Sequence, residues 1–139
     1  TPVRIFTNAD FASPQSLIRH LEKLQTDLIV LAGFLWKIPT ELVRRYSGKM
    51  INLHPALLPE FGGKGMYGLH VHEAVIASGK RRSGISIHLV NENYDEGKII
   101  FQTETEVRET ETQESLAEKI HQLEYNYFPQ VTKEFISGK

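Results

Sequence analysis

The stretch Met50-Ile51-Asn52-Leu53-His54-Pro55-Ala56-Leu57-Leu58-Pro59 decides how the rest of the chain can be arranged. An apolar pair leads into an amide and an imidazole two residues apart, and Pro55 then ends any strand. Because side chains at i and i+2 of an extended segment point to the same face, Asn52 and His54 are predicted to project together from a buried strand. A hydrogen-bond donor beside a group that titrates near neutrality can stabilise an oxyanion and move a proton. The plainer alternative is a strand-end amide beside a core histidine whose hydrogen bonds are satisfied.

Composition predicts a single globular domain over residues 1–139, with 40% hydrophobic and 24% charged residues. A formal net charge of −1 argues against a nucleic-acid partner held by a positive field. The absence of cysteine excludes disulfides and thiolate metal sites. Since no apolar run approaches the roughly 20 residues that span a bilayer, we expect no membrane partner and a cytoplasmic location. The chain opens inside a strand-like pattern, so the beginning of the domain is expected to be missing.

Strands and helices are expected to alternate along the chain. The expected strands are residues 3–6, 28–32, 49–54, 85–90 and 98–107, and the expected helices are residues 14–25, 39–46, 69–78 and a last one from Thr112, kinked at Pro129. Short apolar strands between helices predict an α/β fold with a doubly wound, mostly parallel sheet. In such sheets ligands bind at the carboxyl ends of the strands, so His54, Asp95 and loop 34–38 are expected to face one crevice.

The glycine-rich segment Gly62-Gly63-Lys64-Gly65 invites comparison with a phosphate-binding loop. It lacks the spacing and the hydroxyl of a Walker A motif and does not run directly from a strand into a helix. A mobile lid is the better interpretation, although Lys64 could still contact an anion.

Four histidines, His54, His70, His72 and His88, raise the alternative of a metal site. No acidic partner stands at ligand spacing, and a metal needs a complete and oriented set of ligands. We therefore expect no metal, and we expect His72 to be either structural or a histidine that supports the site residues without contacting the ligand.

Asp95 would ordinarily be a turn residue in Tyr94-Asp95-Glu96-Gly97. The sharper hypothesis places its carboxylate against the imidazole of His54, where it would raise the histidine pKa and orient the ring. Leu35, Trp36 and Ile38 form either ordinary core or one wall of a pocket for an aromatic ligand, and Trp36 beside Lys37 favours the pocket.

Taken together, Asn52 to Pro59, Gly68-Leu69-His70-Val71-His72, Ser86-Ile87-His88 and Asp95-Glu96-Gly97 resemble the phosphoribosylglycinamide formyltransferase family. Residues 31–34 and 124–129 also match its pattern, so the likeness covers nearly the whole chain. Loop 62–67 is longer than the family's. The resemblance implies a Rossmann-like formyltransferase fold and transfer of a formyl group from 10-formyltetrahydrofolate to the amine of glycinamide ribonucleotide, in de novo purine biosynthesis.

Carried over residue by residue, the resemblance implies three groups of site residues. The catalytic group is Asn52, His54 and Asp95; the folate contacts are Leu35, Trp36, Lys37, Ile38, Val90, Asn91, Glu92, Asn93 and Tyr94; the nucleotide contacts are Pro55, His121 and Glu124. The implied partners are these two small molecules, with no metal, and either a monomer or a homodimer is compatible with the sequence.

One departure is that the family begins with a strand–loop–helix unit whose glycine- and serine-rich loop grips the substrate phosphate, and this sequence lacks that unit. Incompleteness is the favoured explanation, since a sheet without that unit would expose an unpaired edge. Three alternatives stay open. They are a formyltetrahydrofolate deformylase or methionyl-tRNA formyltransferase, a non-catalytic folate- or nucleotide-binding module, and a metal hydrolase that uses the histidines.

Overall fold

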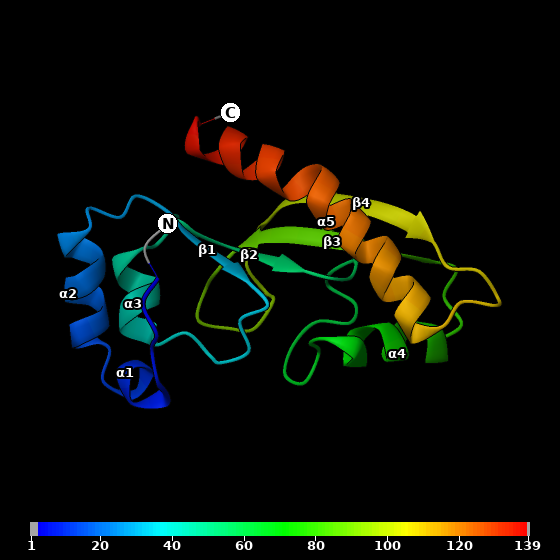
Figure 1. Cartoon of the computed structure of the whole chain (residues 1–139), viewed down its shortest axis with the longest axis horizontal. Coiled ribbons are helices and arrows are strands. Elements are labelled where there is room, and N and C mark those ends of the chain that lie inside the picture. Colours follow the sequence, from blue (N-terminus) through cyan, green and yellow to red (C-terminus); the bar gives the residue numbers. More distant parts are fainter. Residues whose placement is uncertain (1–2, 139) are drawn as a thin grey trace.

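Four strands form one sheet within residues 3–138, which the computed structural model describes. In spatial order they are β1 (Ile29–Ala32), β2 (Met50–His54), β3 (Arg82–Leu89) and β4 (Ile99–Glu106). β1 pairs with β2 in parallel, whereas β2 with β3 and β3 with β4 pair antiparallel (Figure 1).

The predicted α/β class is confirmed, but the prediction of a mostly parallel sheet is wrong for these four strands of the described chain. Residues 90–98 join β3 to β4 without a helix. A parallel neighbour would need a crossover of roughly a dozen residues or more, so this short connection makes the pair antiparallel. An apolar run reports that a strand is buried and says nothing of its direction.

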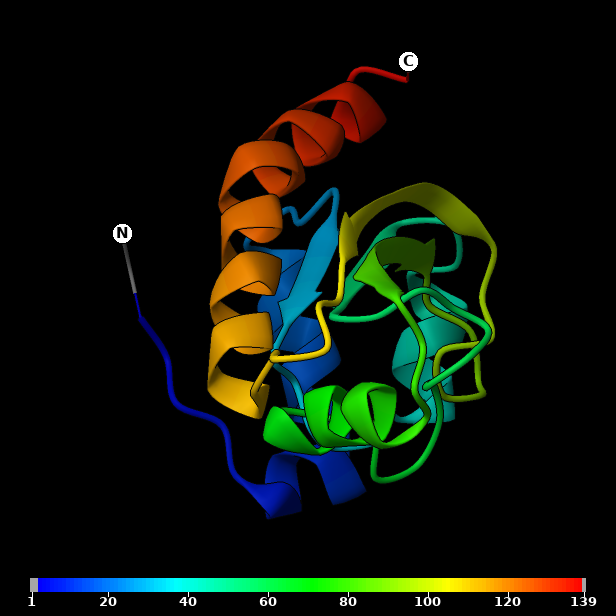
Figure 2. The ribbon, with the colours of Figure 1, turned by 90° about the vertical axis from the view of Figure 1, so that its right-hand side faces the viewer.

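Helices cover both faces of the sheet, as a doubly wound architecture requires. α2 (Gln15–Lys23) and α3 (Thr40–Arg45) lie on the side of β1, with α1 (Asn8–Ala12) next to α2, and α5 (Gln113–Ile136) lies over β3 and β4, with α4 (Leu69–Ala77) packed against α5 (Figures 1 and 2). Met50 packs into a cluster with residues of α2 and α3, whereas Ile51 and Leu53 pack with residues of α4 and α5. Alternate side chains of β2 therefore serve two separate cores.

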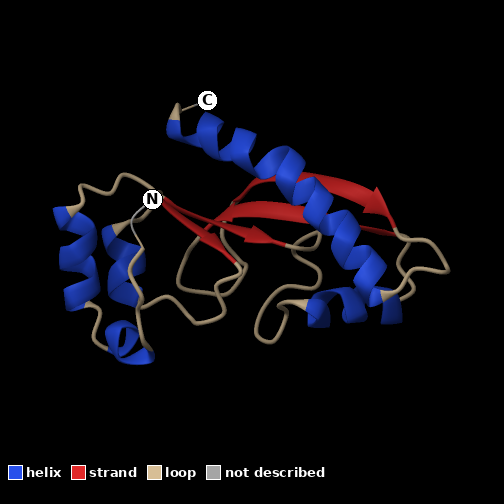
Figure 3. Cartoon of the chain, viewed as in Figure 1, coloured by secondary structure: helices blue, strands red, loops and turns tan. Residues whose placement is uncertain are grey.

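α5 crosses β3 and β4 diagonally (Figure 3). It begins as predicted after Thr112, whose side chain accepts a hydrogen bond from the Ser115 N–H at 3.1 Å. The helix continues through Pro129, and Leu116 and Ile120 are fully buried against the sheet. None of the helices in residues 3–138 combines the length and the apolar character needed to cross a membrane.

Two predictions about the start of the chain are wrong. Residues 3–6 form no strand, and Val3 and Ile5 are more than four-fifths exposed because no strand edge lies beside them. β1 was expected to be buried on both faces, but its residues alternate between half-buried and exposed. The reason is its place at the edge of the sheet within the described residues.

The segment that follows β2 is fixed to the sheet by Ser86. The Ser86 hydroxyl donates to the Ala56 carbonyl at 2.7 Å and accepts from the Leu58 N–H at 2.9 Å. Gln102 Nε2 reaches both the Ser86 hydroxyl, at 2.9 Å, and the Leu58 carbonyl, at 2.8 Å. The loop predicted to be a mobile lid therefore begins on an anchored stretch of backbone.

Ser86 and Ser83 offer a matched test of this anchor, because both are buried in β3 but Ser83 Oγ has no hydrogen-bond partner in the described chain. Ser86→Ala should lower the free energy of unfolding by about 1–3 kcal/mol, since it leaves buried donors unpaired. Ser83→Ala should be neutral or stabilising. Urea unfolding measures both, and equal losses in the two variants would contradict the anchoring role.

Candidate active site

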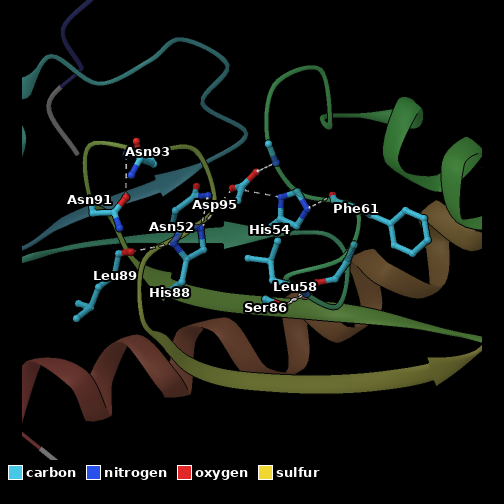
Figure 4. Close-up of polar contacts among 12 residues, drawn as sticks. Asn52, His54, Leu58, Phe61, Ser86, His88, Leu89, Asn91, Asn93 and Asp95 are labelled. Carbon is cyan, nitrogen blue, oxygen red and sulfur yellow. Dashed lines mark hydrogen bonds and ion pairs between the residues drawn. The ribbon is translucent and has the colours of Figure 1, made fainter.

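A cavity of about 790 Å³ opens where the chain leaves β1 and β2. Residues 31–38, 52–55 and 63–69 line it, and so do residues 90–95 between β3 and β4. Because β3 runs antiparallel to β2, loop 90–95 reaches the cavity by folding back across the sheet (Figure 4). The predicted meeting of three loops at one crevice is confirmed, although only two of them leave the carboxyl ends of parallel strands.

The polar wall of the cavity follows from the register of β2 and β3. Asn52 lies opposite His88, and His54 lies opposite Ser86. These four side chains share the sheet face opposite Ile51 and Leu53, which enter the core under α4 and α5. The prediction that Asn52 and His54 project together is confirmed.

Asp95 is the residue that joins the loops to this wall. Its Oδ1 lies 3.5 Å from His54 Nδ1 and 3.4 Å from His88 Nε2, and its Oδ2 accepts the Gly63 N–H at 2.9 Å (Figure 4). Asp95 has a φ of +54°, a left-handed conformation that aspartate tolerates better than most residues. One carboxylate thus contacts β2, β3 and the 62–68 loop.

In both His54 and His88, the ring nitrogen that does not face Asp95 is hydrogen-bonded to a backbone carbonyl. His54 Nε2–H donates to the Phe61 carbonyl at 2.7 Å, and His88 Nδ1–H donates to the Leu89 carbonyl at 2.9 Å. With that tautomer, His88 Nε2 accepts from the Asn52 amide nitrogen at 3.1 Å. The nitrogen of His54 that is left to take up a proton is therefore Nδ1, which faces Asp95.

Sequence reasoning considered His88 only as a metal ligand and missed this contact with Asp95 and Asn52. The signal was present in the alternation of Ser86-Ile87-His88, which places His88 on the polar face, away from the buried Ile87. What the sequence did not supply was the register that sets His88 opposite Asn52.

Burial strongly affects the protonation states of His54 and Asp95. Burial lowers the pKa of His54 below 6.5, and Asp95 and the Phe61 carbonyl offset this only in part. Burial also acts to raise the pKa of Asp95, but the neighbouring His88 and His54 and the Gly63 N–H together hold that pKa below its ordinary value. Asp95 acts to raise the histidine pKa, as predicted, but desolvation outweighs the carboxylate, so the pKa of His54 is lowered on balance. At pH 7 His54 is neutral and Asp95 is ionised.

A second group of titratable side chains lines the cavity where α4 meets α5. His72, expected to be structural or to support the site residues, is 3% exposed and lines the cavity with His121 and Glu124. Burial lowers the pKa of His72, and the neighbouring His121 and His54 lower it further. Burial raises the pKa of Glu124. This end of the cavity therefore holds imidazole and carboxyl groups able to hydrogen-bond a polar ligand.

The opposite wall is aromatic. The Trp36 ring packs edge-on against Phe11 and Phe34, with centroids 5.4 and 6.0 Å apart, and keeps 42% of its surface exposed at the cavity. Ile38 also lines the cavity but is buried. Of the two readings of residues 35–38, core or pocket wall, the structure supports a wall that also packs on the core.

The structure brings every predicted site residue to this one cavity. They are Asn52, His54 and Asp95; residues 35–38 and 90–94; and Pro55, His121 and Glu124. Across residues 3–138 the histidines and acids form no cluster of three or more suited to a metal ion. The placement groups the residues, and the roles of the individual side chains stay predictions.

Comparison with known proteins gives a family match over most of the chain. The model of the family described as "Formyl transferase" matches residues 2–132. The chain is 44% identical over 135 residues to "Phosphoribosylglycinamide formyltransferase, chloroplastic" of Arabidopsis thaliana. The alignment covers 94% of this chain and 46% of that protein, so the chain spans less than half the length of this relative.

Solved structures agree with the family match. Glycinamide ribonucleotide transformylase 1 from Geobacillus kaustophilus superposes with a TM-score of 0.84 at 32% identity, over 94% of this chain and 69% of that one. A formyltetrahydrofolate deformylase from Pseudomonas syringae pv. tomato superposes with a TM-score of 0.79 at 25% identity, over 92% of this chain and 40% of that one.

The lowered histidine pKa values predict how stability depends on pH. Because burial holds the pKa of His54 and of His72 below 6.5, the unfolded chain binds these protons more readily. Their contribution to stability is complete well above 6.5 and is lost as the pH falls through that value toward the folded pKa. Between about pH 8 and about pH 5.5, His72→Gln should therefore lose less stability than the wild type. Urea unfolding at each pH measures this, and an equal or steeper loss in His72→Gln would contradict it.

Proposed function

Because the chain belongs to the formyl transferase family, we propose that it transfers the formyl group of 10-formyltetrahydrofolate to the amine of glycinamide ribonucleotide. The observation that carries the proposal is the convergence of Asn52, His54 and Asp95 on one wall of a cavity lined by aromatic and polar loops. The 44% identity to a phosphoribosylglycinamide formyltransferase supports the choice of acceptor.

The reaction forms a bond between the acceptor nitrogen and the formyl carbon and breaks the bond from that carbon to the folate nitrogen. Attack by the amine places negative charge on the formyl oxygen. Asn52 uses one N–H toward His88 and keeps its second N–H for this oxygen. A donor of this kind contributes on the order of 3 kcal/mol to transition-state stabilisation.

The acceptor amine must also lose a proton, and the folate nitrogen must gain one as it leaves. His54 is neutral before the reaction, and its Nδ1 takes the proton into the space beside Asp95. Asp95 stabilises the imidazolium by its negative charge, and the proton then passes to the leaving nitrogen, directly or through water. A buried, neutral histidine suits this role because it can both accept and return a proton near pH 7.

The two ends of the cavity suit the two substrates. The exposed Trp36 ring and loop 90–94 form a slot for the flat pterin of the folate, with backbone groups available for hydrogen bonds. Pro55, His121 and Glu124 line the same cavity and are the residues that we expect to contact the ribonucleotide. The protein's own part in the chemistry calls for no metal, since hydrogen bonds stabilise the developing charge.

Deformylation of 10-formyltetrahydrofolate is the second candidate, favoured by the TM-score of 0.79 to a deformylase. It would use the same three side chains with water as the acceptor. Incubating the full-length protein with the formylated folate, with and without glycinamide ribonucleotide, separates the two. Formylated nucleotide as the product supports transfer, and formate as the main product in both arms supports deformylation. Folate binding without either product would indicate a non-catalytic module.

The proposed roles predict a split between turnover and binding. His54→Ala and Asp95→Asn should each lower kcat for formyl transfer by about 10²–10³-fold, because each removes a group that acts in the transition state. The folate dissociation constant, measured by fluorescence titration, should change little. His20→Ala, a histidine substitution in α2 away from the cavity, is the control and should leave kcat unchanged. Wild-type turnover in both His54→Ala and Asp95→Asn would refute the assignment.

A further inference from the structure

The short segment Gly63-Lys64-Gly65 lies against the candidate catalytic residues, although no role in the reaction has been given to it. Its first N–H, from Gly63, donates to Asp95 Oδ2 at 2.9 Å. Just upstream, the Phe61 carbonyl accepts from His54 at 2.7 Å. Two bonds to the catalytic side chains thus hold this part of the 62–68 loop over the cavity, which all three residues of the segment line.

The backbone of the segment is shaped to present N–H groups. Gly63 has a φ of +94° and Gly65 a φ of +85°, with Lys64 between them outside the left-handed region. A turn with positive φ at alternate residues is the kind of backbone in which successive N–H groups form a concave site that favours an anion. Within residues 3–138, the N–H groups of Lys64 and Gly65 donate to no backbone carbonyl or side chain. They are available to a ligand.

The Lys64 ammonium is likewise available to a ligand. The Lys64 side chain is exposed, lines the cavity and forms no ion pair within the described part of the chain. Among the acids that line the cavity, Glu92 pairs with Arg44, Asp95 lies between two histidines, and Glu124 forms no ion pair with Lys64 within residues 3–138. None of these acids neutralises the lysine, so its charge is available to a bound anion.

We propose that the Lys64 ammonium and the N–H groups of Lys64 and Gly65 bind an anionic group of a substrate and thereby help to select it. The proposal rests on the proposed function, whose two substrates each carry an anionic group remote from the reacting atoms. One is the carboxylate tail of the folate. The other is the phosphate monoester of the ribonucleotide, to which Lys64 would add a contact beside the glycine- and serine-rich loop that the family resemblance implies. An ammonium beside two backbone N–H groups matches either anion, because each offers several acceptor oxygens.

The test is steady-state kinetics of the full-length protein with Lys64→Gln, Lys64→Arg and the control Lys133→Gln, which removes an exposed lysine of α5 away from the cavity. Each variant is assayed with the ribonucleotide and with its dephosphorylated nucleoside, and with the folate and an analogue that lacks the glutamate tail. Lys64→Gln should raise the KM of one substrate by about tenfold or more with kcat nearly unchanged. Lys64→Arg keeps the positive charge and should have a KM close to that of the wild type. Lys133→Gln should behave as the wild type.

The arms of the experiment identify the anion. If the effect of Lys64→Gln disappears with the nucleoside, the ligand is the phosphate; if it disappears with the tail-less folate, the ligand is the carboxylate. If the wild type is active and Lys64→Gln has the same KM values as the wild type for both substrates, the inference is overturned. An inactive wild type would contradict the proposed function instead, and calorimetric binding of the same four compounds would then decide the inference by the same comparison.

Discussion

The arrangement of the cavity depends on one carboxylate. Asp95 meets His54 and His88 with one oxygen and the Gly63 N–H with the other, so β2, β3 and two loops converge on it. A carboxylate that is this far removed from water persists only when its oxygens have partners. The same three contacts hold its pKa below the ordinary value despite burial. The ionised form of Asp95 and the position of the two loops therefore support each other.

The hydrogen bonds from the two histidines to backbone carbonyls restrict where each imidazole can take up a further proton. Since His54 and His88 each donate to a backbone carbonyl, any further proton must enter on the side of Asp95. Burial keeps His54 neutral until a proton arrives, and the nearby carboxylate then stabilises the charge. The Gly63 contact ties the 62–68 loop to the same carboxylate, so the segment that we infer to bind an anion is positioned by the residue that we propose to serve catalysis.

Much of this site could be predicted from the sequence because it depends on local rules. The spacing of Asn52 and His54 fixes a common face, and Pro55 fixes where the strand ends. Strand direction was not predictable from apolar runs, which is why the antiparallel pairs were missed. The role of His88 needed the register, and the lowered pKa of His54 needed the depth of burial, neither of which a single strand encodes. The register is set by packing of Ile85 and Ile87 against distant helices.

The most direct test of the account is an NMR titration of the His54 imidazole in the wild type and in Asp95→Asn. Since the negative charge of Asp95 acts to raise the pKa of His54 against the effect of burial, its removal should lower that pKa further below the wild-type value. A pKa that is unchanged or higher in Asp95→Asn would show that the carboxylate and the imidazole are not coupled, and would contradict the central claim.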